Sequence, residues 1–492
     1  MVARYGQFIN GGWVDSESSD TFESSNPATG EVIATFPKGT RGDVVRAIEA
    51  AEKAFPKWKA TPAPLRGQIL LRAAQIMRER KQELGEIVSA EMGKVIAEGL
   101  GDVQESIDFL EYMAGEGRRL LGETTTSELQ QKFAMWVRQP IGVVGAITPW
   151  NFPTAIPVWK IAAALISGNT MVFKPATYTP MAVAMLAEVL NEAGLPRGVL
   201  NVVFGPGGTV GDEIVGNPRI KHVSFTGGVP TGIQIMVRAA KHLKSVELEL
   251  GGKNPAIVMP DANIDLVVEG TLFGAFGTAG QRCTATSRLI IHEAVYDEVL
   301  EKLTARTKAL KLGDPLDTSV DMGPVASASQ ERTVLEYIDI GKEEGARLVT
   351  GGEKVTGGKF DKGFFIQPTI FEAEHGMRIT KEEIFGPVLA VMKADSYEEA
   401  VRVANDVEYG LSSSIYTKDV NTAFRAIDDL ETGITYVNAP TIGAEVHLPF
   451  GGIKNTGNGG REAGSTAIDE FTEIKTVFVD YSDRLQKAQI DD

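Results

Sequence analysis

Residues 141–176 read IGVVGAITPWNFPTAIPVWKIAAALISGNTMVFKPA. This stretch begins with one short apolar run, Gly142–Ile147, and ends with another, Thr170–Phe173. Similar runs follow at Val199–Phe204 and His222–Phe225, and helical stretches lie between them. Strands that alternate with helices in this way are typical of a parallel sheet built from βαβ units.

A second series of short apolar runs begins after Glu249, at Ala256–Val258, Ser287–Ile291, Val388–Val391, Ser413–Tyr416 and Thr435–Val437. Before the first series, apolar residues recur every three or four positions in Asp43–Phe55, Pro64–Met92 and Val95–Leu121, which predicts amphipathic helices. A chain of 492 residues that is 43% hydrophobic is long enough for more than one core. We therefore expect an α/β protein with two α/β domains.

Two β-prone segments, Thr124–Arg138 and Lys475–Tyr481, fit neither series. They could pair as an extra sheet between subunits. The sequence contains no low-complexity tract and no repeat of fixed period.

Charge and composition disfavour several classes of partner. The formal charge of -16 would repel phosphate backbones and anionic lipids, so we expect neither nucleic acid nor a membrane as a partner. The N-terminal sequence MVARYGQFINGGW lacks a signal-peptide pattern, and Lys160 interrupts the longest apolar stretch, Ala155–Phe173. A single cysteine cannot form an internal disulfide. These features favour a cytoplasmic protein.

The only cysteine, Cys283, lies in a glycine-rich polar turn, Gly277–Thr284, directly after Arg282. A lone cysteine is commonly buried and inert, but these surroundings would expose a thiolate and stabilise it. Glu249 ends an apolar run and precedes two glycines. It could simply be solvated, or it could activate water to release a thioester formed on the cysteine.

Three further motifs follow predicted strands. Asn151, in Pro-Trp-Asn-Phe-Pro, could satisfy a turn or donate a hydrogen bond to an oxyanion. Residues Phe225–Gly232, FTGGVPTG, join a strand through a glycine turn to a helix start, which can bring backbone N–H groups near a pyrophosphate. Lys174 could reach ribose hydroxyls or a phosphate, although a lysine at a strand end commonly faces water.

The residue types and motifs of this sequence disfavour a metal site and phosphoryl transfer. One cysteine cannot build a thiolate site, and the histidines show no ligand spacing. The five are His222, His242, His292, His375 and His447. The chain has neither a G-x-x-x-x-G-K-[ST] loop nor a G-x-S-x-G elbow. We therefore expect no metal ion in the site.

Six motifs occur in one order: Pro-Trp-Asn-Phe-Pro, Lys-Pro-Ala, Phe-Thr-Gly, Glu-Leu-Gly-Gly-Lys, Gly-Gln-Arg-Cys and Glu-Glu-Ile-Phe-Gly-Pro. In this pattern the chain resembles the NAD(P)-dependent aldehyde dehydrogenases over almost its whole length, from Phe8-Ile9-Asn10-Gly11-Gly12 to the tail. The resemblance implies an aldehyde dehydrogenase fold. It has a Rossmann-like cofactor domain in residues 1–120 and 141–250, an α/β catalytic domain in 251–472, and a small β oligomerisation element in 121–140 and 473–492. It also implies a homodimer or homotetramer.

The same resemblance implies that an aldehyde is oxidised to its acid through a thioester on Cys283. Asn151 and the backbone N–H of Cys283 would form the oxyanion hole, and Glu249 would be the base for hydrolysis of the thioester.

For the cofactor, the resemblance implies that Lys174 holds the adenosine ribose and Glu383 the nicotinamide ribose, while Phe385 packs beside the nicotinamide. The other implied cofactor contacts are Trp150, Thr177, Gly207, Phe225, Thr226, Gly227, Gly228, Gly232 and Leu250.

Two positions depart from the common family pattern. Thr177 stands where NAD-preferring relatives often carry a glutamate, and Gly228 replaces the serine of the commonest Phe-Thr-Gly-Ser turn. Without an acid near the ribose 2′ position, a 2′-phosphate meets less repulsion. We therefore expect NADP to be accepted as well as NAD.

The motifs that bear on the substrate resemble those of two different groups of semialdehyde dehydrogenases. Val158–Lys160 and Gly-Gln-Arg-Cys-Thr resemble the 2-oxoglutarate semialdehyde dehydrogenases, whereas Gly443–Glu445 and the Val-Gln-Glu of residues 103–105 resemble the α-aminoadipic semialdehyde enzymes. The second resemblance implies that Arg282 and Glu105 bind the carboxylate and amine of the substrate. The Arg282 side chain could face the aldehyde tunnel or could pair with a nearby acid and hold the loop. Trp159 and Thr284 are the remaining expected substrate contacts.

A small-molecule aldehyde is thus the expected substrate, and the first choice is a carboxylated semialdehyde such as 2-oxoglutarate semialdehyde. Alternatives are α-aminoadipic semialdehyde and a broad range of aliphatic aldehydes. A CoA-acylating enzyme would typically lack the hydrolytic glutamate, and Glu249 is present. A catalytically silent structural protein of the same fold could lose Cys283 or Glu249 without penalty, and both remain.

Overall fold

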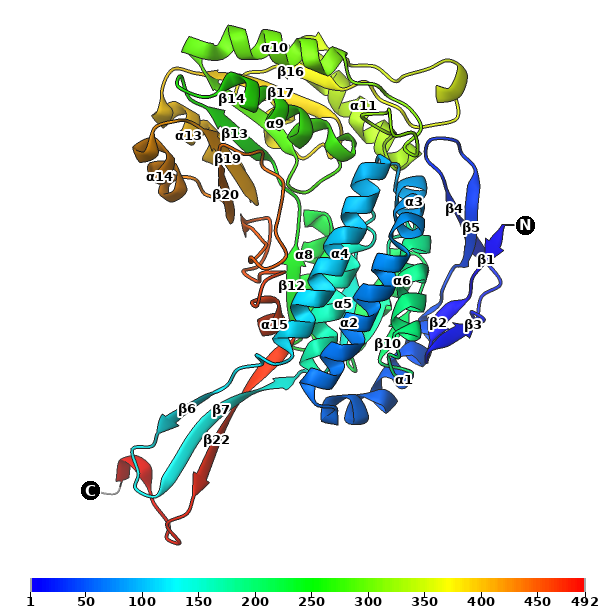
Figure 1. Cartoon of the computed structure of the whole chain (residues 1–492), viewed down its shortest axis with the longest axis vertical. Helices are drawn as coiled ribbons and strands as arrows, with labels where there is room; N and C mark the ends of the chain where they lie inside the picture. Colours follow the sequence, from blue (N-terminus) through cyan, green and yellow to red (C-terminus); the bar gives the residue numbers. More distant parts are fainter. Residues whose placement is uncertain (1, 491–492) are drawn as a thin grey trace.

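The computed structural model describes residues 2–490. Met1 and the last two residues of the expected oligomerisation element, Asp491 and Asp492, lie outside the described residues. Figure 1 shows two α/β bodies, one above the other, and a long three-stranded arm that projects from the lower body toward the C-terminus.

The first sheet has seven strands in the order β12-β11-β8-β9-β10-β2-β3. Strands β8 to β12 run parallel, as the βαβ pattern predicts, and the N-terminal hairpin extends the sheet in the antiparallel sense. The strands are β2 (Gln7–Ile9), β3 (Gly12–Val14), β8 (Val143–Ile147), β9 (Thr170–Lys174), β10 (Leu200–Val202), β11 (His222–Thr226) and β12 (Ser245–Glu249).

Helices cover this sheet: α1 (Arg41–Ala60), α2 (Ala63–Glu79), α3 (Lys81–Met92), α4 (Ile96–Glu116), α5 (Ala155–Ser167), α6 (Pro180–Glu192), α7 (Asp212–Gly216) and α8 (Val229–Ala240). The stretch Pro64–Met92, predicted as helical, is two helices because the backbone leaves helical geometry at Arg80 (φ -102°, ψ 16°). Neither glycine nor proline marks that break, so apolar spacing alone could not reveal it.

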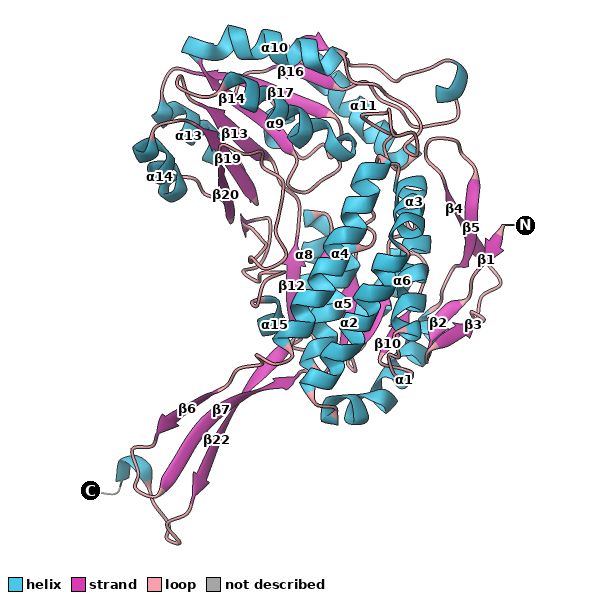
Figure 2. Cartoon of the chain, viewed as in Figure 1, coloured by secondary structure: helices cyan, strands magenta, loops and turns pink. Residues whose placement is uncertain are grey.

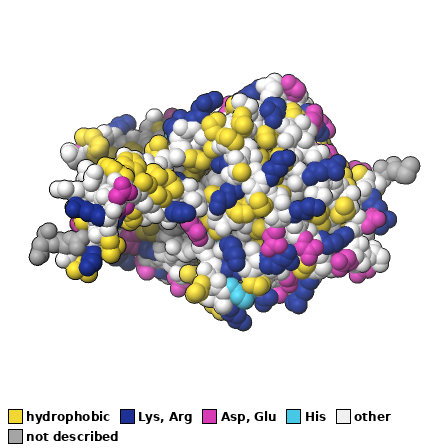
Figure 3. All heavy atoms as spheres, turned by 90° about the horizontal axis from the view of Figure 1, so that it is seen from below, with side chains coloured by type: hydrophobic (Ala, Val, Ile, Leu, Met, Phe, Trp, Pro, Cys, Tyr) yellow, Lys and Arg dark blue, Asp and Glu magenta, His cyan; other side chains and the backbone are white. Residues whose placement is uncertain are grey.

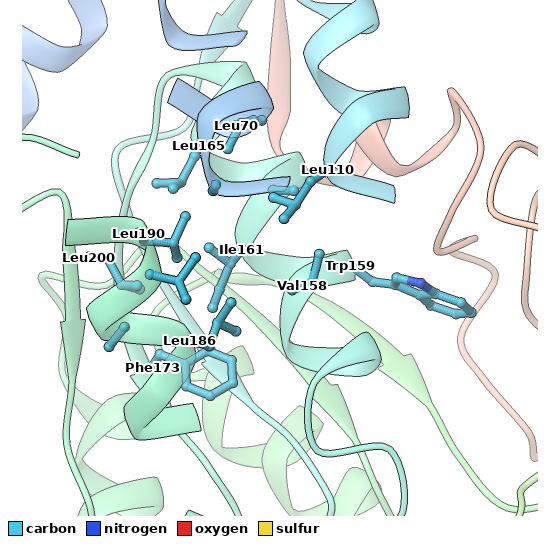
Figure 4. Close-up of a cluster of buried hydrophobic side chains, with 14 of the residues drawn as sticks. Leu70, Leu110, Val158, Trp159, Ile161, Leu165, Phe173, Leu186, Leu190 and Leu200 are labelled. Atoms are coloured by element: carbon cyan, nitrogen blue, oxygen red, sulfur yellow. The ribbon is translucent and has the colours of Figure 1, made fainter. Parts of the chain in front are cut away.

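The core of the first body lies between α2, α4, α5, α6 and the sheet. Figure 4 shows Leu70, Leu110, Ile161, Leu165 and Phe173 pointing into this layer, with Trp159 at its edge. Helix α5 is buried along its whole length, and burial of so many apolar side chains fixes its position on the sheet. The chemistry-bearing residues before and within α5 are therefore held on a rigid element.

The second sheet has the order β15-β16-β17-β14-β13-β19-β20 and is parallel except for the edge strand β15. Its strands are β13 (Asn254–Val258), β14 (Thr286–His292), β15 (Arg347–Thr350), β16 (Thr369–Glu372), β17 (Val388–Ala394), β19 (Ser412–Tyr416) and β20 (Ile434–Val437). Helices α9 (Ile264–Phe276), α10 (Tyr296–Lys308), α11 (Ala328–Glu343), α13 (Tyr397–Asn405) and α14 (Val420–Asp429) lie around it (Figure 2). The five predicted strands are confirmed, and β15 and β16 extend the sheet beyond them.

Small elements complete the two bodies: β1 (Ala3–Arg4), β4 (Thr21–Ser25), β5 (Val32–Pro37), β18 (Tyr409–Gly410), β21 (Ile453–Lys454), α12 (Arg378–Lys381) and α15 (Ala467–Glu470). In residues 2–490, no helix combines the length and the apolar character that crossing a membrane requires.

The arm consists of β6 (Glu123–Thr126), β7 (Lys132–Pro140) and β22 (Thr472–Asp480). Strand β22 pairs antiparallel with the whole of β7, from Thr472 opposite Pro140 to Asp480 opposite Lys132. The two β-prone segments therefore pair with each other within one chain.

The chain returns past the first body before it enters the arm. Phe450, Ile468 and Phe471, within the residues 251–472 expected to form the catalytic domain, belong to the same hydrophobic core as Trp159. The returning segment packs on α5 because it must run from the second sheet to β22 along that helix.

Candidate active site

Cys283 lies in the wall between two cavities. The first, which we call the front cavity, has a volume of about 240 Å³ and is lined by Pro149, Trp150, Asn151, Ile156, Thr226, Gly227, Gly228, Leu250, Gly251, Cys283, Gln330, Glu383 and Phe385. The second, the rear cavity, has a volume of about 110 Å³. It is lined by Glu105, Phe152, Ile156, Trp159, Thr226, Glu249, Leu250, Arg282, Cys283, Thr284, Gly443, Ala444, Phe450 and Glu462. A nucleophile on Cys283 can thus reach molecules that enter from either side.

The turn that carries Cys283 is fixed from several directions. Thr278 and Ala279 adopt positive φ angles of 55° and 52°, which cost free energy in residues other than glycine. A Cβ on Gly280 would lie 2.2 Å from the carbonyl oxygen of Gly386, so only glycine fits there. Asn254 Nδ2 donates to the carbonyl oxygen of Cys283 at 2.7 Å. This turn therefore holds the sulfur in one place.

The surroundings of Cys283 favour its protonated form. Burial raises its pKa to about 12, and the charges of Glu249 and Glu383 act in the same direction. The glycine-rich turn predicts an exposed and stabilised thiolate; Cys283 is partly exposed, but its surroundings favour the thiol over the thiolate. The Arg282 side chain turns toward Glu98 instead, and acids face the sulfur.

Asn151 and the backbone of Cys283 offer hydrogen-bond donors beside the sulfur. Asn151 Nδ2 donates one hydrogen to the carbonyl oxygen of Gln281 at 3.1 Å, which fixes the amide and leaves its second hydrogen for another acceptor. The backbone N–H of Cys283 meets no hydrogen-bond acceptor within the described chain. A carbonyl oxygen placed between these two donors could accept from both.

Glu249 ends β12 and reaches the rear cavity. Its Oε2 is buried and finds no hydrogen-bond partner among residues 2–490. Burial raises the pKa of Glu249 well above its usual value, and the charges of Glu247 and Glu462 raise it further, while Lys160 and Arg461 lower it.

Lys160 and Glu462, which contact each other, were not recognised as site residues from the sequence. The signal that could have found Lys160 is its charge in the middle of the apolar run of α5, which requires a partner. Glu462 lies in a loop that gives no comparable signal.

A third cavity, the outer cavity, has a volume of about 360 Å³ and lies over the same end of the first sheet. Its lining includes Ile147 at the end of β8, Phe225 in β11, Gly207 and Gly208, and residues of α8. A Cβ added to Gly207 or Gly208 would meet no atom within 4 Å, so the backbone there is open to a bound molecule. Phe225 lines the outer cavity and the three residues after it, Thr226 to Gly228, line the front cavity, so the two cavities are neighbours at the end of β11.

Donors that a dinucleotide requires lie in or close behind these two cavities. Thr226 Oγ1 is buried without a partner in the described part of the chain. Lys174 Nζ donates to the carbonyl oxygen of its neighbour Pro175 at 2.7 Å, and burial lowers its pKa to about 8. At the start of α8, Pro230 carries no N–H and the N–H of Thr231 donates to the carbonyl oxygen of Gly228, so within the described residues the N–H groups of Gly228 and Val229 remain for an anion. NAD or NADP fits this set of residues.

Around the front cavity, the ring of Phe385 meets the ring of Trp150 edge to face at 5.4 Å. Glu383 Oε1 accepts from the backbone N–H of Gly252 at 3.1 Å, and burial raises the pKa of Glu383 to about 7. Gln330, which the sequence did not suggest, donates to the carbonyl oxygens of Ile384 and Phe385 and so holds this loop.

Three expected cofactor contacts do not line the cavities described above. Lys174 lies behind Gly211, with its Cδ 3.6 Å from the position of a Cβ there. Gly232 faces Leu250, where a Cβ would come within 2.6 Å of the leucine side chain, so its glycine serves packing. Thr177 is partly exposed in the loop after β9. In residues 2–490, no group of three or more His, Cys, Asp or Glu side chains is arranged to hold a metal ion.

The Arg282 side chain does both of the things expected of it as alternatives: it pairs with an acid near the turn, and it faces the rear cavity. Its Nη2 donates to Glu98 Oε1 at 2.8 Å and its Nε to Thr278 Oγ1 at 3.0 Å, while the side chain also lines the cavity. Nη1 meets no acceptor within residues 2–490 and can donate to a ligand. Burial, and next the charge of Asp102, raises the pKa of Glu105 to about 8, although Arg282 lowers it.

Comparison with known proteins gives one family. The sequence model of the Aldehyde dehydrogenase family matches residues 13–477. The chain is 44% identical to the alpha-ketoglutaric semialdehyde dehydrogenase of Bacillus subtilis, over 96% of this chain and 98% of that protein. It is 40% identical to the betaine aldehyde dehydrogenase of the same organism, over 96% of each chain. The crystal structure of betaine aldehyde dehydrogenase from Staphylococcus aureus in complex with NAD+ superposes with a TM-score of 0.95 at 35% identity, covering 98% of this chain and 96% of that one.

Proposed function

This chain belongs to the aldehyde dehydrogenase family, and on that basis we propose that it oxidises a carboxylated semialdehyde, 2-oxoglutarate semialdehyde in the first place, to the corresponding acid. That it is an aldehyde dehydrogenase that uses NAD(P) follows from the family and from its NAD+-bound structural relatives. The choice of aldehyde and the roles of individual residues are our proposal.

In the proposed first step, Cys283 Sγ attacks the aldehyde carbon. Its proton must leave, because the thiol is neutral before reaction, and it passes to water in the front cavity, which Cys283 also lines. Asn151 Nδ2 and the Cys283 N–H donate to the oxygen as it becomes negative. NAD(P), when bound, accepts the hydride that the aldehyde carbon gives up.

The second step is hydrolysis of the thioester on Cys283. Glu249 lines the cavity that holds the acyl group, and its unpartnered Oε2 can take a proton from a water molecule that attacks the thioester carbon. The C–S bond breaks, the sulfur regains its proton and the acid leaves. The carboxylate of Glu249 favours hydrolysis of the thioester over its transfer to CoA.

The observation that carries the substrate proposal is the place of Arg282 in the rear cavity. The guanidinium has hydrogen-bonding capacity beyond Thr278 and Glu98, and a carboxylate at the far end of the aldehyde could accept from Nη1. Glu105 lies on the same cavity, but with its pKa raised to about 8 it is mainly neutral at pH 7 and does not repel a carboxylate. Identity to the semialdehyde dehydrogenase of Bacillus subtilis supports the same choice.

A second candidate is α-aminoadipic semialdehyde. Glu105 and Arg282 line one cavity, and once Glu105 ionises their opposite charges suit a substrate whose far end carries both an ammonium and a carboxylate. Ionised Glu105 would then bind the ammonium.

The test is a comparison of kcat/KM for four aldehydes with NAD and with NADP. They are 2-oxoglutarate semialdehyde, α-aminoadipic semialdehyde, betaine aldehyde and pentanal. We expect 2-oxoglutarate semialdehyde to exceed pentanal roughly 30-fold or more, since a charge-assisted hydrogen bond contributes on the order of 2 kcal/mol. Equal values for these two aldehydes, or a preference for betaine aldehyde, would refute the proposed substrate.

We further propose that the chain forms a homodimer or homotetramer through the arm. The arm exposes Phe133, Ile474, Phe478, Val479 and Tyr481. A three-stranded sheet that stands away from the body gains little from its own packing, and its free edges invite pairing with another chain. Figure 3, which views the molecule from below, shows several groups of hydrophobic side chains among charged ones on this face.

Helix α8 offers a second apolar surface for this assembly, since Ile233, Met236 and Val237 are about half exposed or more. Sedimentation velocity tests the proposal. A wild-type protein that sediments as a monomer at micromolar concentration would contradict it, and Phe478→Asp should shift a dimer or tetramer toward smaller species.

A further inference from the structure

Strands β11 and β12 carry a row of polar side chains beside the rear cavity. Alternate residues of a strand share one face, so Glu247 points to the same side of the sheet as Glu249. The register between the strands pairs His222 with Ser245, Ser224 with Glu247 and Thr226 with Glu249. This face of the sheet therefore brings two carboxylates side by side, one at the cavity and one behind it.

Lys160 of α5 reaches into this row. Its Nζ donates to Ser224 Oγ at 2.7 Å, to Glu247 Oε2 at 3.3 Å and to Glu462 Oε1. Ser224 Oγ donates to the same Glu247 oxygen at 2.5 Å. Although burial lowers the pKa of Lys160, the carboxylates of Glu247 and Glu462 raise it overall, so the lysine is charged.

The cluster contains three carboxylates for one ammonium. Lys160, Glu247, Glu249 and Glu462 are between 1% and 6% exposed. If all three acids were ionised, two negative charges would remain uncompensated in a buried place, which is unfavourable. The three acids therefore compete for one positive charge, and the cluster retains protons that isolated carboxyl groups would lose.

Glu247 differs from the other two acids in its position. Glu249 and Glu462 line the rear cavity, whereas Glu247 does not, and its Oε1 is buried without a partner in the described chain. Glu247 therefore has no contact with a substrate and can act only through its neighbours.

Other charged groups face the cluster from the surrounding elements. Arg461 lies next to Glu462, donates to the carbonyl oxygens of Gly452 and Gly460, and lowers the pKa of Glu249 through its charge. Glu470 of α15 has its pKa raised to about 7 by burial and by Glu247. His222 is neutral, because burial and then Lys160 lower its pKa to about 3. None of these groups replaces Lys160 as the hydrogen-bonded cation of the cluster.

We propose that Glu247 is a positioning residue that competes with Glu249 for the charge of Lys160 and thereby sets the pH at which Glu249 becomes able to activate water. The inference rests on the proposed role of Glu249 in thioester hydrolysis. Among the neighbouring charges, that of Glu247 has the largest effect on the pKa of Glu249, after burial itself. Deacylation, and not acylation of Cys283, is the step on which Glu247 acts most strongly.

The experiment compares the pH dependence of kcat in wild type and Glu247→Gln. The glutamine keeps the shape and can accept from Ser224 and donate to Glu462, but it carries no charge. We expect Glu247→Gln to retain at pH 6 a share of its maximal kcat at least about threefold larger than that of wild type, because Glu249 ionises at lower pH. The amplitude of the NADH burst in the first turnover should remain one per active site.

Two control variants distinguish the effect of the Glu247 charge from the effect of its hydrogen bonds. Ser224→Ala removes a hydrogen bond to Glu247 but no charge, and Glu247→Asp keeps the charge, so both should follow the wild-type pH profile. If Glu247→Gln does not fold, Glu247→Thr is the second neutral variant, with the same expectation. A neutral variant that folds and gives the wild-type profile would overturn the inference, as would a profile moved to higher pH.

Glu249→Gln distinguishes this failure from a failure of the proposed function. If Glu249→Gln stops turnover after one hydride while the neutral Glu247 variants leave the pH profile in place, only the role of Glu247 is refuted. If Glu249→Gln turns over like wild type, the assigned base itself is wrong, and the inference about Glu247 is refuted with it.

Discussion

Arg282 Nη2 donates to Glu98 Oε1 at 2.8 Å, and both side chains are largely buried beside the turn that carries Cys283. Glu98 also accepts from the backbone N–H of Thr278 through both of its oxygens. The ion pair therefore supports the nucleophile turn at one end, while the guanidinium borders the rear cavity at the other. One arginine can serve structure and substrate recognition together.

Replacement of Arg282 should impair the oxidation of carboxylated aldehydes much more than that of neutral aldehydes. Arg282→Leu is expected to raise KM for 2-oxoglutarate semialdehyde roughly 30-fold or more, since only that substrate loses a charged partner. Pentanal should be affected much less, through the loss of support to the turn. Steady-state kinetics with the two aldehydes measures the ratio.

The matched control is Glu98→Gln, which weakens the support but leaves the guanidinium in place. It should lower activity toward both aldehydes by a similar factor. If Arg282→Leu also lowers activity equally toward both, the arginine acts through the turn alone and the semialdehyde proposal loses its main support.

The two chemical steps should be separable by substitution. Cys283→Ser is expected to abolish oxidation, because a serine hydroxyl is a far weaker nucleophile here. Glu249→Gln should release about one NADH per active site in a burst and then slow at least roughly tenfold, because deacylation loses its base. Stopped-flow fluorescence of NADH measures both phases, and an unaltered steady-state rate in Glu249→Gln would contradict the assignment.

The strands, their alternation with helices and the elements that hold the motifs could be predicted because they follow from local patterns. The apolar run Gly142–Ile147 is buried between two parallel neighbours, and the loop after it carries Asn151 as expected. The glycine turn after Phe225 leads into α8 as expected. These are short-range relations between sequence and backbone.

The charged neighbours of the site could not be predicted because they depend on contacts between distant segments. Glu462 reaches Lys160 only because the chain runs back past α5 before it enters the arm. Likewise, the pairing of Arg282 with Glu98 joins a loop of the second body to α4. The neutral state of Cys283 follows from such contacts and from burial, which a sequence motif does not encode.

Cofactor choice is expected to respond to Thr177. This residue lies in the partly exposed loop after β9, close in sequence to Lys174, and adds no negative charge there. The wild-type enzyme should use NADP at least as well as NAD. Thr177→Glu should raise KM for NADP roughly tenfold or more through repulsion of the 2′-phosphate, while KM for NAD changes little. Thr177→Gln is the uncharged control, and a wild-type enzyme without activity toward NADP would refute this interpretation of the loop.

The buried ion pair between Lys94 and Asp102, beside the loop that carries Asn151, should contribute to the stability of the fold. Lys94 Nζ donates to Asp102 Oδ2 at 3.1 Å, and both side chains are fully buried. Asp102 Oδ1 accepts from Thr154 Oγ1 and from the backbone N–H of Ala155, at the start of α5. Lys94→Met would leave the carboxylate without its cation, and we expect a loss of about 3–5 kcal/mol in the free energy of unfolding.

Urea denaturation followed by tryptophan fluorescence measures that loss. The control is Arg306→Met, which breaks an ion pair with Glu269 on the surface, where both side chains are more than half exposed. It should change stability far less, because solvent screens such pairs. If the two substitutions lower the free energy of unfolding equally, the buried pair of Lys94 and Asp102 contributes no more to stability than an exposed pair.

The charge of Glu105 should make substrate choice depend on pH. Burial, followed by the charge of Asp102, raises the pKa of Glu105 to about 8, while Lys94 and Arg282 oppose the shift. Below this pH the side chain is mainly neutral and tolerates a carboxylate in the rear cavity. As the pH rises through 8, the side chain becomes negative, so KM for 2-oxoglutarate semialdehyde should rise, by roughly tenfold once ionisation is complete.

An aldehyde with a cationic far end should show the opposite trend, since the ionised carboxylate attracts it. Pentanal serves as the reference for every other effect of pH, including ionisation of Cys283, because it carries no charge. In Glu105→Gln the position stays neutral throughout, so the ratio of KM for 2-oxoglutarate semialdehyde to KM for pentanal should remain constant from pH 6.5 to 9.5. If wild type already shows a constant ratio, Glu105 does not change charge in this range or does not face the far end of the substrate.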